Sequence, residues 1–186
     1  MQHSAIQSLI SIDTSVVLWF QHSRTGVLDF IMYAVTTLGE MAAVWIALAL
    51  LALIADKGRG KRVFLCVVAA LILSEILIVG FHHSWMRERP YLVLPGIIPL
   101  GHHWHNTAFP SGHASSCVAA GLIYIQFYRQ LTAPVIAFML LTLVSRVYLG
   151  FHYPSDVLVG ALLGVASYLI VKAVALRRNK DFFGRN

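Results

Sequence analysis

The chain has 186 residues, of which 58% are hydrophobic and 12% are charged. Soluble globular domains carry about 25% charged residues, so this composition excludes an ordinary soluble domain. The net charge of +6 does not indicate nucleic-acid binding, because the basic residues gather at the ends of apolar runs, away from aromatic residues that would stack on bases. The composition predicts an integral helical membrane protein.

The first 39 residues contain two short apolar stretches, 4–20 and 27–39, which are interrupted by polar and charged side chains. We expect these stretches to form amphipathic helices that lie at the membrane interface. An N-terminal crossing of the membrane, which would give six transmembrane helices, is the alternative.

Five apolar runs follow, each near the length of about 20 residues that a helix needs to cross a bilayer. They cover residues 41–55 with a few preceding positions, 63–86, 111–129, 131–149 and 155–176. Residues 87–110 are rich in Pro, Gly and His and predict a loop. We therefore expect an all-α bundle of about five transmembrane helices, in which residues 1–186 form a single membrane-embedded domain.

Basic clusters orient the predicted helices. KGRGKR at 57–62, Arg129 and RRNK at 177–180 fall on one side of the membrane if the spans alternate. The positive-inside rule makes this side cytoplasmic. The segments 82–113 and 145–156 then share the opposite, extracytoplasmic face.

The sequence PSGH at 110–113 opens the third apolar run. Pro110 and Ser111 are residues that favour the start of a helix, and Gly112 lets a ligand approach the backbone closely. The N–H groups at such a start point outward and bind anions. His113 is then expected to lie beside a bound anion, where it can give or take a proton.

The sequence SRVYLGFHYPSD at 145–156 places His152 and Asp156 four residues apart, so that they share a face at the start of the last helix. We expect the Asp156 carboxylate to bond one ring nitrogen of His152 and leave the other free as a nucleophile. Arg89 and Arg146 offer planar guanidinium groups that match phosphate oxygens. This combination predicts a phosphate site.

Three motifs in this order resemble the type 2 phosphatidic acid phosphatase family: RP at 89–90, PSGH at 110–113, and SR, H and D at 145–156 with spacings of five and three residues. The resemblance implies a metal-independent phosphatase that needs no cofactor and works through a phosphohistidine intermediate.

The same resemblance implies a role for each matching residue. His152 attacks phosphorus, Asp156 orients His152, and His113 protonates the leaving oxygen and then activates water. The phosphoryl oxygens are held by Arg89, Arg146, Ser111 and the backbone at Gly112.

The first motif departs from the family, because His82 stands seven positions before Arg89, where the family normally has lysine. An imidazole is only partly protonated near neutral pH, so one positive contact to phosphate is weakened. His83 or Arg87 is the alternative source of this charge. Short polyprenyl-diphosphate phosphatases of the family also relax this lysine.

These expectations combine into one function: hydrolysis of a polyprenyl (undecaprenyl) diphosphate to the monophosphate at the outer face of a bacterial inner membrane. Phosphatidylglycerophosphate phosphatase and lipid A phosphatase are alternatives within the family. A histidine-lined transporter is the alternative outside the enzymes, but it predicts ionisable residues through the full depth of several spans.

Two further features have less specific interpretations. GHHWH at 101–105 suggests zinc, yet no Cys or carboxylate accompanies these histidines, and we expect an interfacial loop and no bound metal. Glu40 and Glu75, within or beside apolar runs, are expected to pair with polar groups inside the bundle, without a catalytic role.

Overall fold

The protein is described by a computed structural model that covers residues 2–101 and 106–184, and within these ranges it contains helices and no strand. In chain order the helices are α1 (Gln2–His22), α2 (Gly26–Leu38), η1 (Glu40–Ala42), α3 (Ala43–Ala55), α4 (Gly60–Ser84), α5 (Pro90–Val93), α6 (Gly112–Phe127), η2 (Arg129–Leu131), α7 (Thr132–Tyr148) and α8 (Pro154–Arg178). The predicted all-α bundle is confirmed, and each of the five predicted apolar runs forms a helix.

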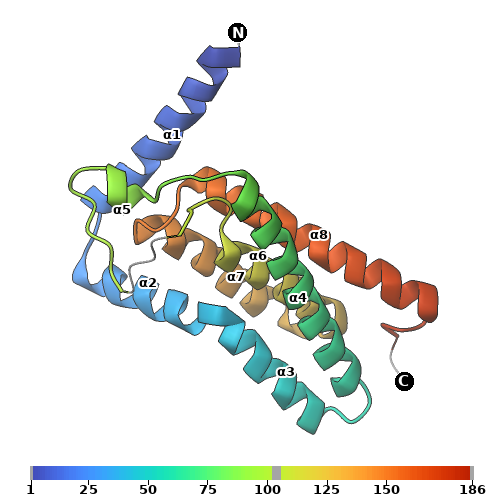
Figure 1. Ribbon diagram of the computed structural model, residues 1–186. Coiled ribbons are helices and arrows are strands. Elements are labelled where there is room, and N and C mark those ends of the chain that lie inside the picture. The colour runs from blue at the N-terminus through green and yellow to red at the C-terminus, as the bar shows by residue number, and fades with distance from the viewer. Residues whose placement is uncertain (1, 102–105, 185–186) are drawn as a thin grey trace.

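Helix α6 lies at the centre of the bundle, between α4, α7 and α8 (Figure 1). Its sequence is rich in Ala, Ser, Gly and Cys, and most of its side chains are buried. Small residues let helix backbones approach closely where no hydrophobic effect drives their association. Gly160 and Gly164 of α8 supply the matching surface: a Cβ atom added there would lie 2.3 Å from the Ser111 carbonyl oxygen and 2.4 Å from that of Ser115, respectively.

The helices differ in their length relative to a bilayer. Helix α4, the segment Arg129–Tyr148 and helix α8 are each long and apolar enough to cross a membrane, and α2 with α3 makes a fourth candidate that is bent by 55°. Helix α6 has 16 residues, which is about 24 Å at the usual rise and less than the ~30 Å of a hydrocarbon core. Consistent with this short length, Thr107, Ala108 and Pro110 just before α6 are buried in the bundle.

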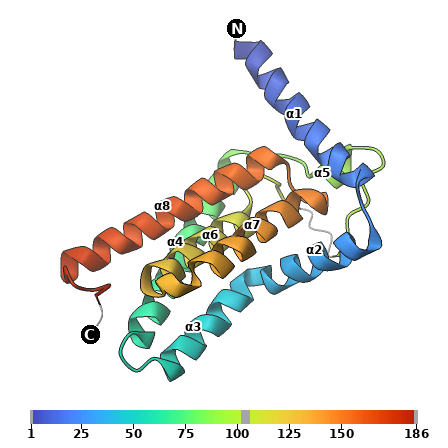
Figure 2. The same cartoon turned by 180° about the vertical axis from the view of Figure 1, so that it is seen from behind.

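The two N-terminal helices are placed differently from each other. Helix α1 projects away from the bundle over much of its length, whereas α2 packs along α7 and continues through η1 into α3 (Figures 1 and 2). We expected both at the interface, but Met32 and Thr36 of α2 are buried against the bundle. Two contacts fix α2 there: Thr36 accepts a hydrogen bond from the buried Arg146, and Met32 packs in a cluster with Tyr148, Leu149 and Phe151.

The contact between α6 and α8 generates a stability prediction. Gly160→Ala places a methyl group against backbone that cannot rotate away, and overpacking of this kind costs about 1–3 kcal/mol. We expect a lower midpoint of thermal unfolding in detergent for this variant. Gly80→Ala is the matched control, because Gly80 is also helical but has open space around its Cα, and its midpoint is expected to stay equal or rise. Equal midpoints for the two variants would contradict this account of the packing.

Candidate active site

A cavity of about 470 Å³ lies where α4 ends and α6 begins. Five of the predicted side chains line it, together with the backbone at Gly112: His82, Arg89, His113, Arg146 and His152. Residues from three separate segments of the chain thus meet around one space, as the motifs predict. The predicted residues Ser111 and Asp156 are fully buried and are not among the residues that line it.

His152 is held in one tautomer by its two neighbours. The ring is 3% exposed, its Nδ1 lies 2.7 Å from the carbonyl oxygen of Ala108, and its Nε2 lies 3.2 Å from Nη1 of Arg89. Because a carbonyl only accepts and a guanidinium only donates, the proton is on Nδ1 and the lone pair is on Nε2. Burial, with the charges of Arg146 and Arg89, holds the pKa of His152 well below its usual range.

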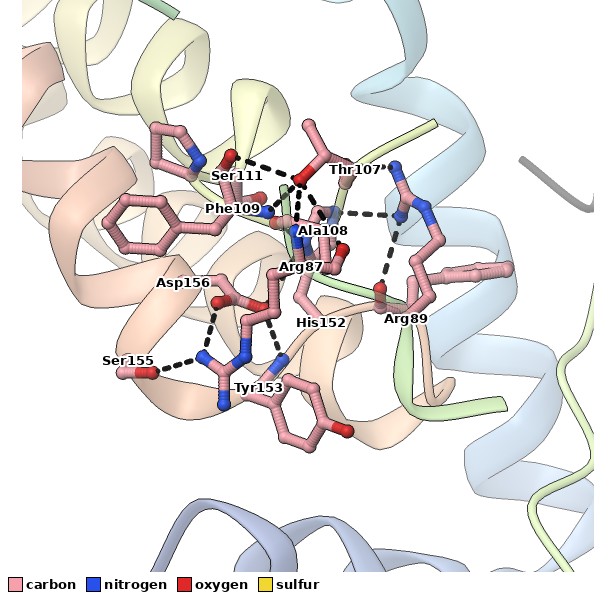
Figure 3. A network of polar contacts seen from close by, with 12 residues as sticks. Arg87, Arg89, Thr107, Ala108, Phe109, Ser111, His152, Tyr153, Ser155 and Asp156 are labelled. Atoms are coloured by element: carbon pink, nitrogen blue, oxygen red, sulfur yellow. Dashed lines mark hydrogen bonds and ion pairs between the residues drawn. The ribbon is translucent and has the colours of Figure 1, made fainter. Parts of the chain in front are cut away.

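The predicted hydrogen bond between Asp156 and His152 is replaced by the one to Ala108. Asp156 Oδ2 is 3.9 Å from His152 Nδ1, which is beyond hydrogen-bond distance. The same oxygen accepts the backbone N–H of Tyr153 at 2.8 Å, and Oδ1 accepts Nη1 of Arg87 at 2.7 Å (Figure 3). Asp156 therefore fixes the backbone next to His152 and leaves a negative charge close to the ring.

Arg89 is 4% exposed and uses all five of its N–H groups. Nε donates to the Asn106 carbonyl, Nη1 to the Phe151 carbonyl and to His152, and Nη2 to the side chain of Asn106 and the Thr107 carbonyl. A phosphate in the cavity must displace one of these partners to reach Arg89. His152, Asn106 and Thr107 all line the cavity, and we expect an anion to replace the contact to His152 Nε2, because this nitrogen has to be free to attack phosphorus.

Arg146 is 3% exposed and, in contrast to Arg89, keeps a donor without a partner. Nη1 donates to the Thr36 hydroxyl at 2.6 Å, and the guanidinium lies 4.7 Å from the centre of the Phe151 ring. Nε is buried and has no hydrogen-bond acceptor. A buried charged donor without an acceptor costs more than the ~1–3 kcal/mol of a neutral one, and a ligand is a common reason for it. The unpaired Nε of Arg146 therefore indicates an anion-binding site beside His152.

PSGH forms the start of α6, with one difference from the expected pattern. Ser111 is the N-cap residue, and its hydroxyl accepts the backbone N–H of Ala114. The N–H of Ser111 itself is taken by the Asp156 carbonyl oxygen at 3.0 Å, so it is not available to an anion. Gly112 and His113 occupy the first helical turn, whose N–H groups have no acceptor inside a helix. The Phe109–Pro110 peptide bond before them is cis.

The structure also distinguishes the three candidates for the missing lysine charge. His82 lines the cavity, with Nε2 3.3 Å from the Pro110 carbonyl oxygen. His83 bonds the Val79 carbonyl on its own helix. Arg87 is engaged by two carboxylates outside the cavity. Only His82 is therefore in a position to meet a ligand.

Several residues of the site were not predicted from the sequence. Glu40 and Glu75, which we expected to pair with polar groups inside the bundle, both line the cavity. Thr107 accepts the backbone N–H of Arg87 and thereby holds the loop that presents the Ala108 carbonyl. The histidines at 102–105 lie outside the described residues. Within the described part of the chain, no three His, Cys, Asp or Glu side chains are grouped closely enough for a metal ion.

Comparison with known proteins agrees with the motifs. The sequence pattern of the PAP2 superfamily matches residues 63–180. Decaprenylphosphoryl-5-phosphoribose phosphatase from Mycobacterium tuberculosis is 35% identical over 142 residues, which are 76% of this chain and 77% of that protein. Undecaprenyl-diphosphatase BcrC from Bacillus subtilis is 31% identical over 142 residues, 73% of this chain and 68% of that protein.

Other relatives extend this comparison. The chain covers 56% of the bacitracin transport permease protein BcrC from Bacillus licheniformis, with 32% identity over 61% of its own length. The crystal structure of LpxE from Aquifex aeolicus has the same fold, with a TM-score of 0.76 over 86% of this chain and 93% of that chain at 22% identity. The chain therefore belongs to the PAP2 superfamily, and the relatives from Mycobacterium tuberculosis and Bacillus subtilis are named as phosphatases of polyprenyl-linked phosphates.

Proposed function

We propose that this protein is a metal-independent lipid phosphatase that converts a polyprenyl diphosphate, undecaprenyl diphosphate in particular, to the monophosphate. The reaction takes place at the extracytoplasmic face of a bacterial inner membrane. The observation that carries the proposal is a neutral, buried His152 whose Nε2 lone pair faces a cavity with two buried arginines. A nucleophile beside fixed positive charge suits attack on a phosphoryl group.

In the first step, the lone pair of His152 Nε2 attacks the terminal phosphorus. The bond between this phosphorus and the bridging oxygen breaks, and the polyprenyl monophosphate leaves with the electron pair. His113, which lines the same cavity, enters this step as the imidazolium, a form that the negative charge of the bound substrate favours, and gives its proton to the departing oxygen. Arg146 and Arg89 stabilise the negative charge on the phosphoryl oxygens, together with the backbone at Gly112.

In the second step, His113 accepts a proton from water, and the resulting hydroxide attacks the phosphohistidine. The bond between phosphorus and Nε2 breaks, its electron pair returns to the imidazole, and inorganic phosphate leaves. While phosphorylated, the His152 ring carries a positive charge. The Asp156 carboxylate, 3.9 Å from Nδ1, stabilises this charge without being protonated itself.

A lipid substrate is supported by the composition of the cavity wall. The arginines and histidines share this wall with apolar side chains, Ile46 of α3 and Leu71, Ile72 and Ile78 of α4. A headgroup with a long hydrocarbon tail matches such a mixed lining, because apolar chain and apolar side chains are removed from water together. A soluble phosphate ester would leave the apolar side chains without a partner.

A second candidate substrate is a phosphorylated sugar carried by a lipid, and Glu40 and Glu75 favour it. Ionised carboxylates accept hydrogen bonds from hydroxyl groups and repel an additional phosphate. Both line the same cavity as His152. The relative from Mycobacterium tuberculosis is named for a phosphoribose lipid of this type.

Phosphate release from purified protein in EDTA tests the proposed function. We expect undecaprenyl diphosphate to be hydrolysed faster than phosphatidylglycerophosphate and decaprenylphosphoryl-5-phosphoribose, and we expect His152→Ala to lower the rate by at least ~10³-fold, because it removes the nucleophile. His83→Ala is the control, since His83 lies outside the cavity. Faster hydrolysis of the phosphoribose lipid would favour the second candidate, and release by His152→Ala would refute the mechanism.

The protonation of His152 gives a prediction for pH dependence. Because its pKa is held well below the usual range, the ring is expected to stay neutral, with the proton on Nδ1, as the pH falls through the range where ordinary histidines gain charge. The ring-nitrogen chemical shifts of ¹⁵N-histidine-labelled protein report this state, and His152→Ala identifies the signal. A His152 signal that titrates like an exposed histidine would contradict the geometry of the site.

A further inference from the structure

Arg87 lies outside the cavity and joins two buried carboxylates. Its Nη1 donates to Asp156 Oδ1 at 2.7 Å and to Ser155 Oγ at 2.7 Å, and its Nη2 donates to Asp13 Oδ2 at 2.8 Å (Figure 3 shows the first two). The guanidinium carbon lies 3.9 Å from the centre of the Tyr153 ring, which closes the remaining face. Without this cation, the two carboxylates would repel each other in a poorly solvated place.

Asp13 comes from α1, the helix that otherwise projects away from the bundle (Figure 2). It is 5% exposed, accepts the backbone N–H of Ser155 at 2.9 Å, and also accepts the Ser155 hydroxyl. Val17, one turn later on the same face, is buried against Tyr153 and Val157. The second half of α1 is thus fixed to the start of α8.

The two carboxylates accept different backbone N–H groups at the start of α8. Asp13 binds the N–H of Ser155, and Asp156 binds the N–H of Tyr153, which is the residue next to His152. Negative charge is favoured at a helix N-terminus, so both are stabilised there. Through this chain of contacts, a residue of α1 restrains the backbone that carries the proposed nucleophile.

We propose that Asp13 and Arg87 are positioning residues for the phosphatase reaction. With Asp156 they form a carboxylate–guanidinium–carboxylate clamp that holds His152 in line with the phosphorus. The catalytic part of this inference rests on the proposed function. Through Asp13, the clamp makes α1 part of the support of the active site.

The kinetic test compares Asp13→Asn and Arg87→Gln with the control Asp29→Asn in the full chain in detergent, with undecaprenyl diphosphate as substrate. The control removes a carboxylate that pairs with Arg24 at 2.9 Å and bonds Tyr148. We expect kcat to fall about 10- to 100-fold in both clamp variants, as for residues that orient a reactive ligand from behind. KM should change by less than about twofold, because neither side chain lines the cavity.

A double variant separates positioning from general destabilisation. Asp13→Asn combined with Arg87→Gln should lower kcat no further than the more damaged single variant, because both changes open the same clamp. Asp29→Asn combined with Arg87→Gln should show the product of its two single effects. A kcat for Asp13→Asn equal to that of Asp29→Asn, or multiplicative effects within the clamp, would overturn the proposal.

Hydrogen–deuterium exchange gives a readout that does not need turnover. The peptide covering residues 151–158 should exchange faster in Asp13→Asn and Arg87→Gln than in the parent and in Asp29→Asn. Without the ion pairs of Arg87, the two side chains that accept its N–H groups are held less firmly. Equal exchange in all four proteins would overturn the clamp. Faster exchange in a chain that hydrolyses none of the three lipids would support the clamp and refute the proposed function.

Discussion

The site depends on the hydrogen bond from Nδ1 of His152 to the carbonyl oxygen of Ala108. A backbone carbonyl cannot donate or take up a proton, so it fixes the tautomer at every pH at which the ring is neutral. The bond connects the loop before α6 to the loop before α8, two segments that are 44 residues apart in the chain. The close packing of α6 on α8 through Gly160 and Gly164 holds these two loops at this distance.

The second constraint is that buried charge near a membrane must be compensated. Arg89 is satisfied by carbonyl oxygens and an amide, Arg87 by two carboxylates, and Arg146 only in part. The incomplete compensation of Arg146 leaves a buried donor that an anion in the cavity is expected to satisfy. Helix α2 contributes to this balance through Thr36, and helix α1 contributes through Asp13. Both N-terminal helices therefore contribute a hydrogen-bond acceptor to one of these arginines.

The sequence predicted the helices and the charged and histidine side chains at 82, 89, 113, 146 and 152 that meet in the cavity, because apolar runs and motif spacing report directly on local structure. It did not predict the partner of His152, since a backbone carbonyl leaves no residue signature. The i, i+4 spacing of His152 and Asp156 suggested a hydrogen bond between the two side chains. Asp156 instead accepts the backbone N–H of Tyr153 at the start of α8. Asp13 was recognisable in principle as a charge in an apolar stretch, but nothing in its neighbours indicates contact with residues 142 positions away.

Trapping of the covalent intermediate tests the central claim most directly. His113→Asn removes the group that activates water, while the polyprenyl phosphate leaving group depends less on protonation, so phosphohistidine should accumulate. The protein is mixed with undecaprenyl diphosphate labelled in the terminal phosphoryl group and quenched in alkaline detergent, and the labelled peptide is mapped by mass spectrometry. The account predicts a phosphoryl group on His152 in His113→Asn and none in His152→Ala. Label on another residue, or turnover without any covalent label, would contradict it.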